Sequence, residues 1–201
     1  KLYFESKGSY EETNFENSSL DINQNYVLWN GLKIGKLIFC QGFQATKNVL
    51  FNWLPFAPVK GQILEVATEK QLQPYIINQG IFILPTSEFL CKVGAPYSWD
   101  DLDWESTDSA RIELETKFQQ LFKADYKIVG QVAGIRPSSN DRRPILGMHP
   151  AYSNVGILNG LGTKGVTLAP FFANQLVSYL ENGKELNSLV NIKRYFSLYF
   201  R

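Results

Sequence analysis

Alternating apolar and polar residues predict a series of short strands in the first half of the chain. Residues 26–29 and 32–39 are apolar runs on either side of Asn30-Gly31, a pair typical of a two-residue hairpin turn. The same pattern predicts further strands at residues 62–68, 75–78, 80–85 and 89–93. Strands of this length, separated by turn residues, favour an antiparallel meander. Residues 1–24 are polar and are predicted to be irregular.

The second half of the chain predicts two longer helices. Apolar residues at helical spacing indicate a helix over residues 109–123, preceded by three suitable N-cap residues, Ser106, Thr107 and Asp108. A second helix is predicted over residues 166–181, because Asn182-Gly183 is a natural C-terminal stop. Strands at residues 127–135, 144–148 and 155–158 and a short final helix within 189–199 complete the prediction.

Composition narrows the class of protein. The 201 residues are 44% hydrophobic and 14% aromatic, which favours a β-rich core or a flat ligand surface. With 20 Lys and Arg against 19 Asp and Glu, the net charge of +1 argues against nucleic acid as a partner. No apolar run approaches the roughly 20 residues of a membrane-spanning helix. Cys40 and Cys91, both expected in buried strands, are too few for a disulfide scaffold and favour a reducing, cytoplasmic location.

Few residues offer protein-borne catalysis. His149 is the single histidine, no Ser-His-Asp or Cys-His arrangement accompanies it, and we interpret it as structural. The aspartates 100, 101 and 103 alternate with large apolar residues and lack the Gly and Glu of a calcium loop, which favours a solvated acidic turn. We therefore predict no metal site.

A cluster of glycines lies between the strand at 155–158 and the helix that follows. Residues 160–165 match G-x-G-x-x-G, in which glycines allow close backbone approach and free N–H groups at a helix start attract negative charge. A complete dinucleotide-binding unit needs a second strand with an acidic residue about 20 positions further on. Only residues 183–201 follow the helix, without an apolar strand. Two interpretations remain: a helix start that faces an electron-rich ligand, and a tight turn with no ligand.

Several motifs resemble a known family. Residues 133–137 (Ala-Gly-Ile-Arg-Pro), 156–165 and Ala169-Pro170 are similar to the C-terminal half of the FAD-dependent amino-acid oxidases. That family includes D-amino-acid oxidase, glycine oxidase, sarcosine oxidase and D-amino-acid dehydrogenase. Residues 58–62 and 92–97 resemble other segments of the family, so the resemblance extends over about residues 30–196.

The resemblance implies an α+β fold. It consists of an antiparallel β-sheet substrate domain with flanking helices, plus C-terminal pieces of a Rossmann-like FAD domain. Residues 1–44 would be an incomplete end segment of the FAD domain, 45–135 the substrate domain with one helix, and 136–201 the flavin-facing loop and helix. Because the family's ADP-binding G-x-G-x-x-G is not found, we expect a C-terminal portion whose N-terminal FAD-binding half is missing and which is inactive alone.

The resemblance also implies roles for individual residues. Arg136 resembles the arginine that pairs with a substrate carboxylate, for which a planar guanidinium is suited. Its alternative is to tie down a loop through carbonyl groups or Asp141. Tyr97 would place a hydroxyl over the substrate, although Pro96 departs from the family's Gly-Ala-Thr-Tyr. The predicted cofactor contacts are Gly42, Gly160, Gly162, Thr163, Lys164 and Gly165, with simple turn glycines as the alternative.

The implied reaction is oxidation of a small amine or amino acid by hydride transfer to the flavin of FAD. The cofactor then carries the chemistry, and no catalytic protein residue is predicted. Two other functions are considered. One is a cofactor-free module that binds a small acid, and the other is the oxidase domain of a tRNA-modifying enzyme, which the near-zero net charge disfavours.

Overall fold

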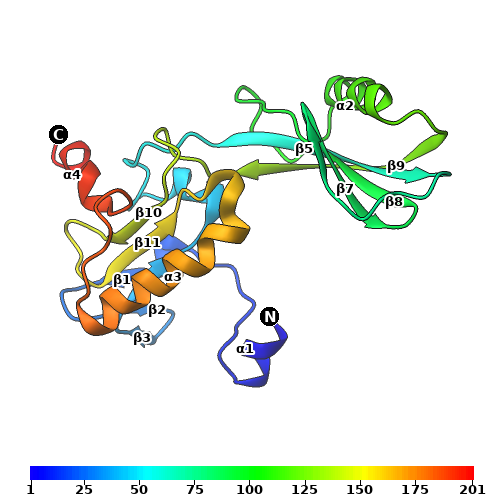
Figure 1. Ribbon diagram of the computed structural model, residues 1–201. Coiled ribbons are helices and arrows are strands. Elements are labelled where there is room, and N and C mark those ends of the chain that lie inside the picture. The colour runs from blue at the N-terminus through cyan, green and yellow to red at the C-terminus, as the bar shows by residue number, and fades with distance from the viewer.

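Two long antiparallel strands, β5 (Val59–Thr68) and β9 (Tyr126–Arg136), run from one lobe of the molecule into the other (Figure 1). The computed structural model describes residues 1–201. β5 lies inside a five-stranded sheet of order β6-β7-β8-β5-β9 in which all neighbours are antiparallel. The other strands are β6 (Ile77–Gln79), β7 (Ile81–Ser87) and β8 (Leu90–Gly94). The predicted antiparallel meander is confirmed.

Helix α2 (Asp108–Leu121) covers one face of this sheet (Figure 1). The side chain of Thr107 accepts a hydrogen bond from the Ala110 N–H, as predicted for an N-cap residue. Leu114 and Phe118 pack into a core with the inward residues of the strands, such as Leu64. Because side chains alternate along a strand, the intervening residues lie on the opposite, open face of the sheet.

The second lobe is layered around a small mixed sheet. β4 (Leu37–Phe39) runs parallel to β11 (Val155–Asn159), which pairs antiparallel with β10 (Ile145–Met148). Helix α3 (Gly165–Asn182) packs on one face of this sheet. The meander of β1 (Leu20–Ile22), β2 (Val27–Trp29) and β3 (Leu32–Ile34) contributes to the core on the other face. The remaining elements are α1 (Leu2–Ser6), η1 (Asn17–Ser19), η2 (Gly42–Lys47), η3 (Gly162–Lys164), η4 (Ile192–Tyr195) and α4 (Phe196–Tyr199).

The structure corrects four predictions in detail. The strand predicted at residues 32–39 is interrupted at Gly35-Lys36, and its halves, β3 and β4, belong to different sheets. The first 24 residues hold a short exposed helix and β1, and the last predicted helix is partly a 3-10 turn. Cys40 follows β4 and is exposed, whereas Cys91 is buried in β8 as expected. No helix has both the length and the apolar character to cross a membrane.

Candidate functional site

Arg136 closes β9 where the two lobes meet. Its side chain lies across the neighbouring strand over Gly61, where an added Cβ would come within 2.1 Å of Arg136 Nη2. Nη1 is 3.4 Å from the carbonyl oxygens of Lys60 and Pro96, which is long for a hydrogen bond. Burial lowers the pKa of Arg136, but an arginine in protein stays charged. The guanidinium therefore keeps most of its donor capacity for another partner.

Tyr97 lies beside this guanidinium. The Cζ atom of Arg136 is 4.8 Å from the centre of the Tyr97 ring, and the ring stacks on Trp99. Tyr97 is 57% exposed, so its hydroxyl remains accessible. The structure thus brings together the two residues predicted to bind substrate. Asp141 pairs instead with Arg194, so the alternative in which it binds Arg136 is wrong. The alternative contacts with loop carbonyls are present, although long, and the Pro96 carbonyl oxygen belongs to the loop that carries Tyr97.

An apolar surface continues from Arg136 along the open face of the sheet. Gly61 and Ile63 are on this face, and Ile63 is paired with Gly94 of β8. The side chains of Phe82 and Ile63 lie over Gly94, where an added Cβ would meet Phe82 Cζ at 2.7 Å. Sequence reasoning missed Phe82, because its alternation in β7 gave no sign of which face would stay open.

A cavity of about 590 Å³ joins Tyr97 to the glycine cluster. Its walls come from the loop after β8, the loop after β9, and the turn between β11 and α3. Predicted site residues that line it are Tyr97, Gly160, Gly162, Thr163 and Lys164. Arg136, Gly42 and Gly165 are not among the lining residues, and Arg136 adjoins the cavity through Tyr97. One concave site therefore contains elements of both the predicted substrate site and the predicted cofactor site.

The turn from β11 to α3 contains two glycines in a left-handed conformation. Gly160 and Gly162 have φ of +72° and +54°, a conformation that favours glycine. An added Cβ at Gly160 would lie 3.2 Å from the Arg143 carbonyl oxygen, and one at Gly162 would lie 3.2 Å from Ser138 Oγ. The turn is therefore closely packed at both glycines, and its exposed residues are Thr163 and Lys164.

Asn159 connects this turn to Gly42. It is buried, its Nδ2 donates to the Gly42 carbonyl oxygen at 2.7 Å, and its Oδ1 accepts from the Gly160 N–H at 2.8 Å. Gly42 has a φ of +57° and follows β4, the parallel neighbour of β11. Ligands of open α/β sheets bind at such carboxyl ends of neighbouring parallel strands. The sequence marked both glycines but gave no signal for Asn159.

The start of α3 is open. No side chain caps it, and Val166 in its first turn is 94% exposed. Unsatisfied N–H groups at a helix start carry partial positive charge and stabilise nearby negative charge. The interpretation of residues 160–165 as a helix start that faces a ligand needs such an open end, and the structure provides it.

The turn that holds the aspartates 100, 101 and 103 is not simply solvated, contrary to expectation. Asp101 and Asp103 are about half exposed and both bind the ammonium group of Lys60, which is 1% exposed. The sequence offered no signal for this contact, because the predicted strand at residues 62–68 did not include Lys60. The partners of Lys60 lie 41 and 43 residues away, and local patterning cannot identify them.

His149 and a second hollow lie outside this site. His149 is buried, stacks on Tyr152 at 5.0 Å, and accepts a hydrogen bond at Nδ1 from the Ala151 N–H. Burial lowers its pKa, so it is neutral at pH 7.

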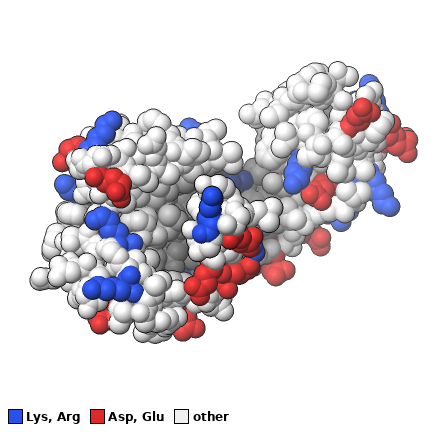
Figure 2. Space-filling view, turned by 90° about the horizontal axis from the view of Figure 1, so that it is seen from below, with Lys and Arg blue, Asp and Glu red and all other residues white.

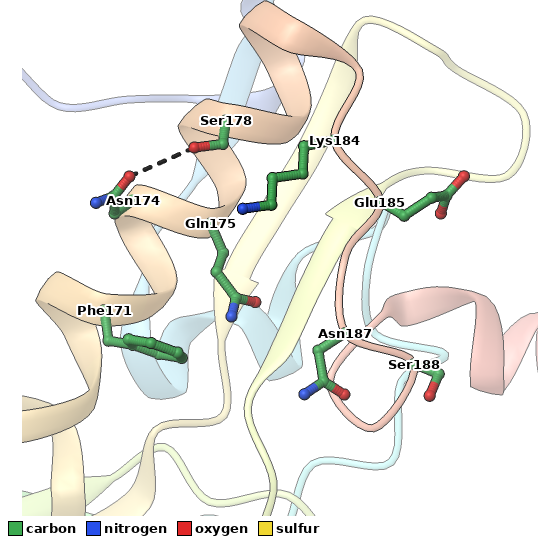
Figure 3. A pocket seen from close by; sticks show the side chains of 8 residues that line it. All are labelled: Phe171, Asn174, Gln175, Ser178, Lys184, Glu185, Asn187 and Ser188. Atoms are coloured by element: carbon green, nitrogen blue, oxygen red, sulfur yellow. Dashed lines mark hydrogen bonds between the residues drawn. The ribbon is translucent and has the colours of Figure 1, made fainter.

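The second hollow, of about 660 Å³, lies between α3 and the loop after it, and its polar side chains share one hydrogen bond, from Ser178 to Asn174 (Figure 3). It contains no predicted site residue.

Comparison with known proteins decides the family. The model of the DAO family, described as FAD dependent oxidoreductase, matches residues 13–179. The chain belongs to this family. Glycine oxidase of Pseudomonas aeruginosa is 27% identical over 135 residues, which cover 66% of this chain and 37% of that protein. Glycine oxidase of Bacillus subtilis is 29% identical over 137 residues, which cover 66% of this chain and 36% of that protein.

Solved structures confirm the α+β fold of this DAO-family chain. Iminodiacetate oxidase from Chelativorans sp. BNC1 superposes with a TM-score of 0.71 and 25% identity. The match covers 88% of this chain and 51% of that one. The DAO-family chain thus spans little more than a third of the curated relatives it matches, and about half of the solved one.

The residues present fit the flavin end of FAD, the cofactor on which the family depends. The supporting observations are the position of the glycine turn in the wall of the cavity and the uncapped start of α3 beside it. Gly160, Gly162, Thr163 and Lys164 line the cavity in which the ring system would lie, and Gly165 opens the helix. The Gly160 and Gly162 N–H groups already donate to Asn159 Oδ1 and to the Pro137 carbonyl oxygen. Gly42 is held against the same turn through Asn159.

Proposed function

We propose that this chain is the C-terminal part of an FAD-dependent oxidoreductase that oxidises a small amine or amino acid. The observation that carries the proposal is that Tyr97, which lies over the Arg136 guanidinium, lines the same cavity as the glycine turn. A carboxylate site and a cofactor-facing helix start therefore adjoin. Names of relatives support glycine and iminodiacetate as the first substrates to test.

Each part of the site has a physical role in this proposal. FAD bound there would accept a hydride from the substrate carbon that carries the nitrogen. Arg136 binds the carboxylate through donors that the Lys60 and Pro96 carbonyls leave free. Tyr97 covers the guanidinium and excludes water from one side. The first turn of α3 stabilises negative charge at the end of the ring system by about 0.3–2 kcal/mol.

Unpartnered surfaces support the proposal that an ADP-binding segment completes the protein. Along α3, Val166, Pro170, Ala173 and Val177 form an exposed apolar stripe, with Val166 94% and Val177 56% exposed. The 11-residue β9 is an edge strand, and so is β4. Long unpaired edges and apolar stripes are liabilities unless another segment covers them. The relatives, about twice to nearly three times as long as their matched part, contain such additional chain.

Charge and cysteine chemistry bear on the alternatives. On the face shown in Figure 2, Lys and Arg side chains are scattered among Asp and Glu and form no single basic patch, which gives no support to a tRNA partner. Both cysteines are free thiols, which supports the proposed cytoplasmic location. A cofactor-free acid-binding module would use Arg136 but leave the open helix start without a role.

The test is anaerobic reduction of the flavin in the complete polypeptide. We expect the purified protein to be yellow, and glycine, sarcosine or iminodiacetate to bleach its flavin absorption. A colourless folded protein, or a flavin that none of a panel of amino acids and secondary amines reduces, would contradict the proposal. Binding of these acids to flavin-free protein with full affinity would favour the cofactor-free module.

A further inference from the structure

Lys60 is buried within β5, and its ammonium group forms ion pairs with two aspartates. Its Nζ lies 3.0 Å from Asp101 Oδ2 and 2.5 Å from Asp103 Oδ1. The hydrogen bond to Asp103 raises the pKa of Lys60, and the same contact lowers that of Asp103. Lys60 and Asp103 are therefore both ionised at neutral pH, and the buried ammonium group is held by two carboxyl groups that are half exposed to solvent.

The two carboxylates belong to a loop, residues 95–107, which we call the acidic loop. It also carries Tyr97 and the Pro96 carbonyl oxygen that faces Arg136. Its first part lies against Lys60, because the Lys60 N–H donates to the Ser98 carbonyl oxygen at 2.8 Å and the Ser98 N–H donates back at 3.0 Å. One residue of β5 thus contacts the acidic loop through its backbone and its side chain.

Arg136 depends on the same strand. Lys60 and Gly61 are neighbours in β5, so their side chains point to opposite faces of the sheet. The Arg136 side chain lies over Gly61, and its Nη1 approaches the Lys60 carbonyl oxygen. The ammonium group of Lys60 holds the acidic loop on the other face. Lys60 therefore connects the loop that carries Tyr97 with the strand that supports the guanidinium.

We propose that Lys60 is a positioning residue: by holding Asp101 and Asp103 it fixes the acidic loop, and through it Tyr97 and the guanidinium of Arg136. This inference rests on the proposed function, in which Arg136 binds the substrate carboxylate. Lys60 itself does not touch the substrate. Its effect is on the geometry of the carboxylate site, so its loss weakens substrate binding while the chemical step at the flavin is unchanged.

The fold does not depend only on the ion pairs of Lys60 with Asp101 and Asp103. The far end of the acidic loop is held separately, because Gln62 Nε2 donates to Thr107 Oγ1 and the Thr107 N–H donates to Gln62 Oε1, both at 2.9 Å. Thr107 is the N-cap of α2. Lys60→Met removes the buried charge and leaves two carboxylates that are already half in solvent. The backbone pair between residue 60 and Ser98 also remains. This variant therefore loosens residues 99–105, including the Trp99 ring that stacks on Tyr97, while α2 stays anchored.

Steady-state kinetics of the complete flavoprotein test the positioning role. We expect Lys60→Met to raise KM for the amino-acid substrate about 10–100-fold, with kcat within about threefold and an unchanged flavin spectrum. Lys60→Arg keeps the charge and both carboxylate contacts and should restore KM to within about threefold. The matched control is Lys92→Met, which breaks an exposed 3.6 Å pair with Glu65 in the same sheet and should change neither constant.

Hydrogen exchange gives a readout that is independent of activity. In Lys60→Met we expect the amides of residues 99–105 to exchange faster and those of α3 to be unchanged. If Lys60→Met does not accumulate as folded protein, Asp101→Ala removes a single half-exposed partner and should show the same changes to a smaller degree.

The outcomes separate the inference from the proposed function. Unchanged KM or unchanged loop exchange in Lys60→Met overturns the positioning role, while an elevated KM in Arg136→Ala leaves the proposed function standing. If Arg136→Ala also has wild-type KM, Arg136 does not bind the substrate carboxylate and the role of Lys60 falls with it, whereas the proposed function itself fails only if the flavin is absent or is not reduced. If Lys60→Met lowers kcat and loses bound flavin in the same proportion, the substitution damages the protein as a whole, and this result also overturns the positioning role.

Discussion

Asn159 donates a hydrogen bond from Nδ2 to the carbonyl oxygen of Gly42 at 2.7 Å, across 117 residues of sequence. The same amide accepts from the Gly160 N–H, so one buried side chain fixes the turns that follow β4 and β11. Each turn contains a glycine with positive φ. The relative position of the two turns thus depends on Asn159, and we propose that both face the cofactor.

Replacing this amide tests the link. Asn159→Ala leaves the Gly42 carbonyl and the Gly160 N–H without their partner, so we expect a loss of about 1–3 kcal/mol in the free energy of unfolding. In the complete protein FAD should also dissociate more readily. Asn174→Ala is the control, because Asn174 is exposed on α3 and makes a single 3.4 Å contact with Ser178. Urea denaturation of both variants measures the difference, and equal stability would contradict the role of Asn159.

Gly61 and Gly134 face each other in β5 and β9 and form a matched pair. An added Cβ at Gly61 would meet the Arg136 guanidinium at 2.1 Å, whereas at Gly134 nothing lies within 4 Å. The end of an arginine side chain can move, so we expect Gly61→Ala to keep stability within about 1 kcal/mol while displacing Arg136. The expected result is a KM raised by about tenfold or more. Gly134→Ala should keep wild-type KM, and equal KM values for the two variants would contradict the placement of Arg136.

The sequence predicted those parts of the fold that depend on local pattern. The meander, α2 with its Thr107 cap, and α3 with its stop at Gly183 were all evident from periodicity and turn residues. The separation of β3 from β4 was not, because both halves are apolar and the choice is made by pairing with β11, more than 100 residues away. Parallel pairing leaves no local signal.

The site divides in the same way. Arg136, Tyr97 and the glycines were found from their motifs, and the structure places Tyr97 and the turn glycines around one cavity. Lys60 and Asn159 were missed, since each owes its role to partners at distant positions. A buried lysine and a buried asparagine are anomalies only once burial is known.

The charge and shape of Arg136 should both matter to substrate binding. We expect Arg136→Ala to raise KM for an amino acid by about 100-fold or more, because a charge-assisted bidentate contact is lost. Arg136→Lys keeps the charge without the planar fork and should fall between. Arg111→Ala removes an exposed arginine on α2 and serves as the control. For an amine substrate without a carboxylate, KM should change little in any of these variants. If Arg136→Ala raises KM equally for amines and amino acids, Arg136 does not bind the carboxylate.

His149 should make stability depend on pH. Burial lowers its pKa in the folded protein, so as pH falls through about 6.5 the unfolded chain takes up the proton first. The free energy of unfolding should therefore fall toward pH 5, by at most about 1.4 kcal/mol per pH unit. No other histidine is present, and the pKa values of Asp103 and Asp141 are shifted down, away from this range.

His149→Asn keeps an acceptor for the Ala151 N–H and should flatten the dependence of the unfolding free energy on pH between about pH 5 and 7. Because aromatic packing against Phe51 is lost, the variant should be less stable than the wild type at pH 8. Urea titrations at several pH values measure this, and an unchanged slope in the variant would show that a group other than His149 titrates on unfolding.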